Sequence, residues 1–352
     1  MTEQPTSPST TVEIGVETFG DVTADADGTM LSHGQVLRDV VAEGQLADRV
    51  GLDFFGIGEH HRVDYAVSAP EVVMGALAST TQRIKLGSAV TVLSSDDPVR
   101  VFERFSTVQA LSNGRAEIIA GRGSFIESFP LFGFDLQDYE LLFEERLDLL
   151  VELLRNQPVT WTGQTRAGLT DQQVFPTAEQ PIPLWVGVGG TPQSVVRAAQ
   201  HGLGLMLAII GGEPMRFAPL ANLYRRALDQ LGRPQLPVAA HLHGFVADTD
   251  DEAADLLFPH YEAQMRKMGS ERGWGGYSRT AFGAALAPEG NLLVGSPETV
   301  AQKMAAIVKG LGLARIDVKY SNGTLPHEGI MRSIELMGTR VKPRVHELLA
   351  GQ

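Results

Sequence analysis

The chain has 352 residues and a formal net charge of −13, because 42 Asp and Glu outnumber 29 Lys and Arg. A negative field repels polyanions, so this balance argues against nucleic acid as a partner, while 43% hydrophobic residues suffice for a large core. The chain contains no cysteine, which excludes disulfides, thiolate metal sites and a cysteine nucleophile.

Residues 1–11 are rich in Ser, Thr and Pro, and we expect them to form a flexible tail. They lack the basic and apolar regions of a secretory signal. No apolar run approaches the roughly 18 to 20 residues that cross a bilayer. We therefore expect a cytoplasmic protein without membrane contact, with residues 12–350 forming one domain.

From residue 12 onward, strand-like apolar runs alternate with segments of helical period, which is typical of βα units and a parallel sheet. A doubly wound sheet would need a glycine-rich turn after the first strand, but residues 17–21 contain one glycine. The pattern instead predicts an α/β fold of the (β/α)8 TIM barrel type. Its eight expected strands are residues 12–18, 53–58, 84–93, 116–120, 184–188, 204–209, 238–246 and 315–320.

Two segments interrupt the alternation. Residues 158–183 contain several prolines and predict a short hairpin before the fifth strand. Residues 268–291, near the last strands, are too irregular for one long helix. This insertion is expected to be either a lid over the active site or a subunit contact.

Active sites of such barrels lie at the carboxyl ends of the strands. Directly after the second strand come Glu59, His60 and His61, which could supply a general base, a hydrogen-bond acceptor or metal ligands. Adjacent residues in an extended segment point to opposite sides, so at most one histidine faces the barrel mouth easily. A purely structural, hydrogen-bonded histidine pair remains an alternative.

The fourth strand is followed by Arg122 between two glycines. Its guanidinium could bind a phosphate, or it could pair with the nearby Glu127 or Asp135. The fifth strand leads through Gly189 and Gly190 into a helix start that resembles an anion cradle. Because consecutive strands are neighbours in a barrel, we expect the arginine and the helix start to share one phosphate.

Four blocks occur in an order that resembles the luciferase-like flavin monooxygenase family, and the likeness runs from about residue 12 to about residue 345. The blocks are Gly-Glu-His-His with Ser-Ala-Pro at 58–70, Thr-Gln-Arg-Ile-Lys-Leu-Gly-Ser-Ala-Val at 81–90 with Asp-Pro-Val-Arg at 97–100, Leu-Ser-Asn-Gly-Arg at 111–115 with Gly-Arg-Gly at 121–123, and Gly-Gly-Thr-Pro at 189–192.

The resemblance implies a monooxygenase that uses reduced FMN, supplied by a separate reductase, and O2 on a small organic molecule. His60 matches the family's base, with Glu59 beside it. The flavin ring would lie against Ala89 and Val90, where the family often has a non-prolyl cis peptide. The phosphate would be held by residues at two strand ends: Arg122, Gly189, Gly190, Thr191 and Ser194. A homodimer is implied as well.

Departures from the family pattern keep alternatives open. The light-emitting enzymes have a reactive cysteine where this chain has Gly121, so light emission is not implied. The alternatives are a deazaflavin-dependent hydride-transfer enzyme, a non-catalytic flavin-binding subunit and, more distantly, a metal-dependent hydrolase. The hydrolase would use His241 and His243, which share one face of the seventh strand, together with His60 or His61.

The substrate pocket is expected between the loop after the first strand, residues 125–134 and the insertion. Aromatic side chains in these segments suggest an apolar pocket but name no molecule: Phe19, Phe125, Phe129, Phe132, Trp274 and Tyr277.

Overall fold

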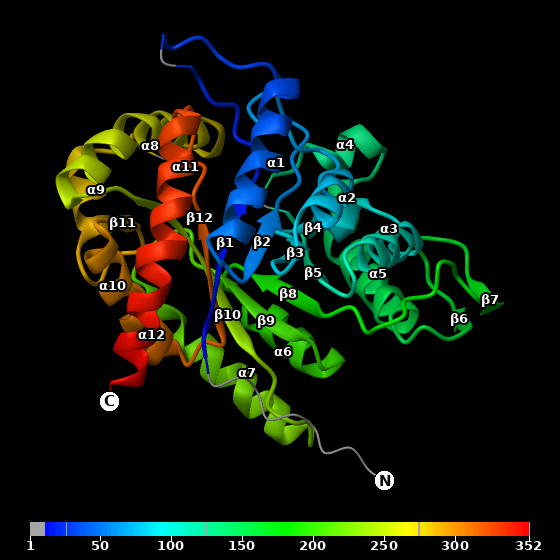
Figure 1. The fold of residues 1–352 in the computed structure, drawn as a ribbon. Helices are drawn as coiled ribbons and strands as arrows, with labels where there is room; N and C mark the ends of the chain where they lie inside the picture. The colour runs from blue at the N-terminus through cyan, green and yellow to red at the C-terminus, as the bar shows by residue number, and fades with distance from the viewer. Residues whose placement is uncertain (1–10, 26, 124, 274, 352) are drawn as a thin grey trace.

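The computed structural model describes residues 11–25, 27–123, 125–273 and 275–351, so residues 1–10 of the expected tail lie outside the described residues (Figure 1). At its centre, parallel strands form a closed ring in which β1 pairs with both β2 and β12, and β9 pairs with both β8 and β10. The predicted (β/α)8 barrel is thereby confirmed. Its strands are β1 (Glu13–Thr18), β2 (Phe54–Ile57), β3 (Lys85–Ser88), β5 (Ala116–Gly121), β8 (Leu184–Val188), β9 (Gly204–Ala208), β10 (Val238–Val246) and β12 (Arg315–Lys319).

Helices surround the sheet (Figure 1). The apolar stripes at helical spacing are buried against it, and polar caps start the helices: Ser32 accepts from the backbone N–H of Gln35 before α1, and Asp97 caps α3. The long helices are α1 (His33–Arg49), α2 (Pro70–Thr80), α3 (Pro98–Leu111), α5 (Tyr139–Leu153), α6 (Pro192–His201), α7 (Ala218–Gln230), α8 (Asp250–Arg272), α10 (Pro297–Leu311), α11 (His327–Leu336) and α12 (Lys342–Ala350), with a π-helical turn, η4 (Met337–Val341), before α12.

Several short helices and strands lie outside the ring of eight strands. The predicted hairpin is present as the antiparallel pair β6 (Val159–Trp161) and β7 (Leu169–Gln172). The insertion contains the end of α8, the helix α9 (Arg279–Leu286) and the approach to β11 (Leu293–Gly295), which pairs with β10 beside the ring. The remaining short elements are α4 (Ser128–Phe132), η1 (Leu93–Ser95), η2 (Leu136–Asp138) and η3 (Pro214–Phe217).

The third strand differs from the prediction, because residues 84–93 do not form one continuous strand. β3 pairs with β5 at Gly87 and Glu117, and β4 (Thr91–Val92) pairs with β5 again at Thr91 and Ala120. Four steps along one strand thus oppose three along the other, which is a β-bulge of one extra residue. The Ala89–Val90 peptide within this bulge is cis.

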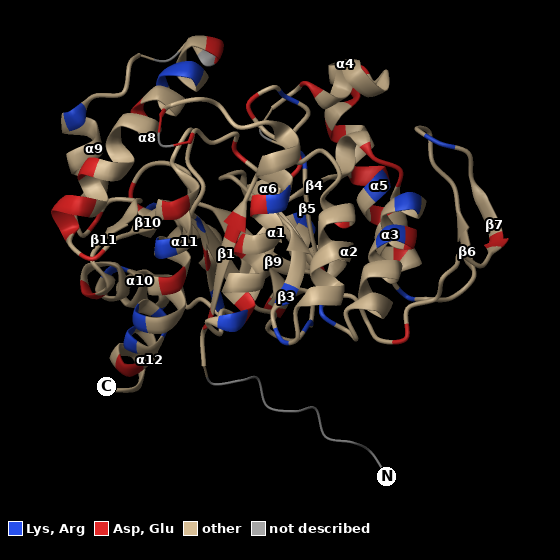
Figure 2. Cartoon of the chain, turned by 45° about the horizontal axis from the view of Figure 1, so that its top comes forward, with Lys and Arg blue, Asp and Glu red and all other residues tan. Residues whose placement is uncertain are grey.

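The outer surface carries mixed charge, and Figure 2 shows basic residues interspersed with acidic ones along the outer helices. None of the helices in the described ranges is long and apolar enough for a membrane crossing.

The barrel interior contains a buried charge cluster around Arg315. Its guanidinium lies 4.0 Å from the ring centroid of Phe54 and 4.7 Å from that of Trp185, and it donates to Glu117 at 2.6 Å. Burial would raise the pKa of Glu117, but Arg315 and Lys85 outweigh burial and hold that pKa below its usual range. Burial does raise the pKa of Asp317, whose carboxylate lies 3.0 Å from Arg315 Nε. The fold therefore depends on a cation inside its barrel.

We expect Arg315→Met to lower the free energy of unfolding by about 3 to 5 kcal/mol, because Asp317 loses its cation and Glu117 keeps only Lys85. A carboxyl whose folded-state pKa exceeds its unfolded value favours folding as the pH falls. The deficit should therefore be smaller at pH 5 than at pH 8. Urea unfolding at both values measures it. Arg38→Met on the exposed face of α1 is the control and should change stability by less than about 0.5 kcal/mol; an equal loss in both variants would contradict the role of the cluster.

Candidate functional site

The exit of β2 places His60 in an aromatic enclosure at the barrel mouth. The side chain is 6% exposed, and its ring centroid lies 5.0 Å from that of Phe19, 4.5 Å from that of Tyr65 and 5.0 Å from that of Phe125. Its Nδ1 atom lies 3.5 Å from Glu127 Oε1. Burial would raise the pKa of Glu127, but the interaction with His60 and hydrogen bonds from backbone N–H groups, including that of His61, together outweigh burial and lower that pKa. One side of the imidazole thus faces a carboxylate.

Glu59 and His61 form a separate pair. The Nε2 atom of His61 lies 2.8 Å from Glu59 Oε1, while Glu59 Oε2 accepts from the backbone N–H of Val92 at 3.4 Å. The two imidazoles therefore have different carboxylate partners, as expected for neighbours in an extended segment. Glu59 is in the same region as His60, but it supports β4 and His61 rather than the His60 ring.

The exits of β5 and β8 bring Arg122 and the start of α6 together, as the order of the strands predicts. Arg122 Nη2 lies 3.5 Å from Ser194 Oγ, and the Thr191 hydroxyl donates to Ser194 Oγ at 2.8 Å. The expected alternative partners of Arg122 were wrong: its guanidinium pairs with Glu140 on α5. Glu127 lies instead beside His60, because the β5–α5 connection runs over the mouth of the barrel.

The glycine turn before α6 leaves room for a ligand. A Cβ atom added to Gly189 or Gly190 would meet nothing within 4 Å, both residues are exposed, and the Thr191 side chain makes no capping bond to the helix. An arginine, two hydroxyls and a helix N-terminus in this arrangement fit a phosphate group. A bound phosphate would have to displace Glu140 from Arg122. The Glu140 side chain is 58% exposed, so water can solvate the displaced carboxylate.

A cavity of about 580 Å³ opens next to the aromatic rings that enclose His60, at the carboxyl ends of the barrel strands. Of the aromatic residues expected to line a pocket, Phe19, Phe125 and Tyr277 do. The prediction was wrong for Phe129, which is buried against Tyr139, and for Phe132, whose ring packs on His61. Residue 274 lies outside the described residues. A loop sequence indicates aromatic content but not which rings turn inward.

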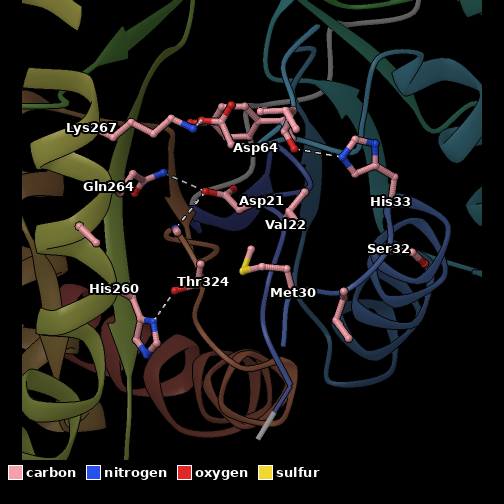
Figure 3. Close-up of a pocket in the computed structure, with 15 residues that line it drawn as sticks. Asp21, Val22, Met30, Ser32, His33, Asp64, His260, Gln264, Lys267 and Thr324 are labelled. Atoms are coloured by element: carbon pink, nitrogen blue, oxygen red, sulfur yellow. Dashed lines mark hydrogen bonds and ion pairs between the residues drawn. The ribbon is translucent and has the colours of Figure 1, made fainter. Parts of the chain in front are cut away.

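A second cavity of about 470 Å³ adjoins the first, with Tyr65 and Gln264 in the lining of both. Figure 3 shows the second cavity, with Gln264 on one side and Asp21 opposite it. Gln264 reaches across to donate to Asp21 at 2.9 Å, and Lys267 lies 3.1 Å from Asp64. Tyr65 and Gln264 thus form the partition between the two cavities.

The insertion forms one wall of the first cavity, through residues of α9 and the segments on both sides of it. Lys303 on α10 anchors one end of this wall: its buried ammonium donates to the carbonyl oxygens of Ala287 at 2.6 Å and Leu292 at 2.9 Å, and it lies 3.2 Å from those of Ala285 and Leu286. A cation at the last carbonyls of a helix stabilises that helix end.

Buried polar groups lie at the base of the cavity. Lys319 Nζ lies 3.0 and 3.2 Å from the two carboxylate oxygens of Asp21, and His241 Nδ1 pairs with Glu17. His241 and His243 share a face of β10, as predicted, with ring centroids 6.0 Å apart. Within the described ranges, no three His, Asp or Glu side chains group as metal ligands. Sequence reasoning missed these buried pairs, because their members are far apart in the chain.

Gly121 permits close packing behind the bulge. A Cβ atom at this position would lie 2.6 Å from Val90 Cγ2, and the short, β-branched valine cannot swing aside freely. We therefore expect Gly121→Ala to lower the free energy of unfolding by about 1 to 3 kcal/mol in urea titrations. Gly189→Ala, where the added atom meets open space, is the matched control and should leave the midpoint nearly unchanged. Equal midpoints for both variants would refute the packing argument.

A family model described as luciferase-like monooxygenase matches residues 18–315. The chain is 27% identical over 323 residues to 4-hydroxyprotoasukamycin monooxygenase from Streptomyces nodosus subsp. asukaensis, covering 86% of this chain and 85% of that protein.

Among solved structures, one similar fold is that of the oxygenating constituent of 3,6-diketocamphane monooxygenase from Pseudomonas putida, in complex with FMN. It superposes with a TM-score of 0.77 at 19% identity, covering 95% of this chain and 98% of that chain. An F420-dependent secondary alcohol dehydrogenase superposes with a TM-score of 0.71 at 16% identity, covering 95% and 99%. The family model spans most of the chain, and the protein belongs to the luciferase-like monooxygenase family.

Proposed function

We propose that this protein is an FMN-dependent monooxygenase that receives reduced FMN from a separate reductase and oxidises a small organic molecule with O2. The observation that carries the proposal is the convergence of Arg122 and Ser194 beside the open Gly189–Gly190 turn, at the rim that also holds the bulge at Ala89 and Val90. The FMN complex of the structurally similar Pseudomonas putida monooxygenase supports the same choice of cofactor.

The phosphate of FMN would be held by the side chains of Arg122, Thr191 and Ser194 and by the backbone at Gly189 and Gly190. Reduced FMN, when bound, would supply the two electrons needed to insert one atom of O2 into the substrate and release the other as water.

His60 is the proposed proton carrier. Because Glu127 lies at Nδ1, Nε2 is the atom that accepts and returns the proton. Glu59 would position β4 through its bond to the backbone of Val92. The rings of Phe19, Tyr65 and Phe125 keep water away from the His60 imidazole.

We expect Arg122→Ala to weaken binding of FMN by about 10- to 100-fold while leaving riboflavin binding unchanged, because a charge-assisted bond to phosphate is lost. Titration of flavin fluorescence measures both ligands. Glu140→Gln should change FMN affinity in the opposite direction by a few fold, because it removes the carboxylate that competes for Arg122.

Arg344→Ala, which breaks an ion pair with Glu298 far from the site, is the control for a general loss of charge. Equal weakening of FMN and riboflavin in Arg122→Ala would contradict the phosphate assignment. Binding of coenzyme F420 in preference to FMN would favour hydride transfer, which the similarity to an F420-dependent dehydrogenase makes the second candidate.

We expect His60→Gln to slow the reaction of bound reduced FMN with O2 by about 100-fold or more, because glutamine cannot accept and return a proton. Stopped-flow absorbance at several pH values measures this. His201→Gln on α6 serves as control. If the unaltered protein binds reduced FMN but the bound flavin reacts with O2 no faster than free reduced FMN does, the protein is a flavin-binding subunit and the proposal is wrong.

A further inference from the structure

We propose that the cavity of about 580 Å³ accepts an uncharged, largely apolar substrate whose polar group, a carbonyl or hydroxyl oxygen, hydrogen-bonds to His243. The inference deepens the proposed function, because it names the class of molecule that the proposed monooxygenase would oxidise. It rests on three properties of the cavity: its walls, its charge balance and one buried imidazole.

The walls are mainly apolar and aromatic. They come from the β1 exit, α8, α9 and the segment between the two helices, and they include Phe19, Tyr261, Met265, Met268 and Tyr277. Three alanines of α9 complete this side: Ala281, Ala284 and Ala285. Thioether and aromatic side chains fit apolar molecules of irregular shape and gain by excluding water from them.

The charge of Lys319, which lines the cavity, is already compensated by a buried carboxylate. Lys319 is 1% exposed and Asp21 is 3% exposed, and the ammonium lies within 3.2 Å of both carboxylate oxygens while also contacting the carbonyl oxygen of Ser321. An anionic substrate would have to take Lys319 from Asp21, and a cationic one would have to take Asp21 from Lys319. Either exchange leaves a buried charge uncompensated. At the rim, the exposed carboxylate of Glu213 further disfavours anions.

His243 is one of two described residues in the cavity lining that carry a buried polar atom without a partner; the other is Gln264, through its Oε1 atom. Its side chain lines the cavity, the residue is only 5% exposed, and its Nδ1 atom makes no hydrogen bond to any residue that the structure describes. It stands opposite Lys319 in the β10–β12 pairing, and the ring of Tyr261 packs edge-on against it at 5.8 Å. A buried polar atom without a partner is costly, so a ligand that satisfies it gains affinity.

The imidazole is neutral in this setting. Burial lowers the pKa of His243 well below its usual value, and the nearby Lys319 and His241 lower it further, while the interaction of the imidazole with Asn322 opposes this only in part. A neutral imidazole carries one donor and one acceptor and no charge. It therefore suits a ketone, aldehyde or alcohol oxygen better than a carboxylate, for which a cation would be the stronger partner.

Binding of matched naphthalene probes tests the proposal. Acetylnaphthalene, naphthylethanol, naphthoate, naphthylmethylamine and isopropylnaphthalene, all substituted at the same ring position, differ in charge and polarity but little in shape. Equilibrium dialysis of the full chain, with and without oxidised FMN, gives their dissociation constants. We expect the ketone or the alcohol to bind at least about tenfold more tightly than naphthoate and the amine. Equal or tighter binding of either charged probe would overturn the proposal.

Variants then assign the polar contact. His243→Leu should weaken binding of the ketone or the alcohol by about three- to tenfold while leaving isopropylnaphthalene within twofold, and His243→Gln, which keeps a hydrogen-bonding group, should restore part of the loss. His260→Leu makes the same change in the neighbouring cavity and should alter none of the constants (Figure 3). Unchanged binding of both oxygenated probes in His243→Leu would overturn the assignment. The probe ranking is measured without cofactor as well, so failure of FMN to bind would refute the proposed function alone.

Discussion

Eight parallel strands can form a ring only if the first and last of them pair, and the pairing of β12 with β1 meets this requirement. Because every strand in the ring runs in the same direction, every carboxyl end lies on one rim. Residues separated by as many as 300 positions in the chain thereby become neighbours, and the site is built from residues at or just beyond the strand ends. The members discussed above are Asp21, His60, Arg122, Ser194, His243 and Lys319.

Much of this arrangement is predictable, because it derives from periodicity. Apolar runs mark the strands, and their alternation with helical stripes predicts the barrel. The opposite orientations of His60 and His61 result from extended geometry, and the meeting of Arg122 with Ser194 results from the adjacency of consecutive strands. The break between β3 and β4 could not be predicted from periodicity, because the small or β-branched residues from Ser88 to Val92 also fit a continuous strand.

The sequence pattern does not predict which polar residues interact when they are distant from each other in the chain. The partners of Arg122 and His60 depend on the path of the connection between β5 and α5, where no periodicity limits the course of the chain. The buried charges of Arg315 and Lys319 were equally hidden. A charged residue in a strand ordinarily indicates a solvent-facing position, and only the closed ring reveals that these two side chains face inward toward carboxylates.

Lys303 has a consequence for how the cavity wall can move. One ammonium is shared among carbonyl oxygens at the end of α9 and at Leu292, so that end is tethered to α10 by several bonds that would have to break together. The start of α9 is held to α8 instead, by an ion pair between Arg279 and Asp255 and by the ring of Phe282 against that of Phe258. The two ends of α9 are therefore fastened to different helices, so a ligand that widened the cavity by displacing this wall would have to break contacts to α8 as well as to α10.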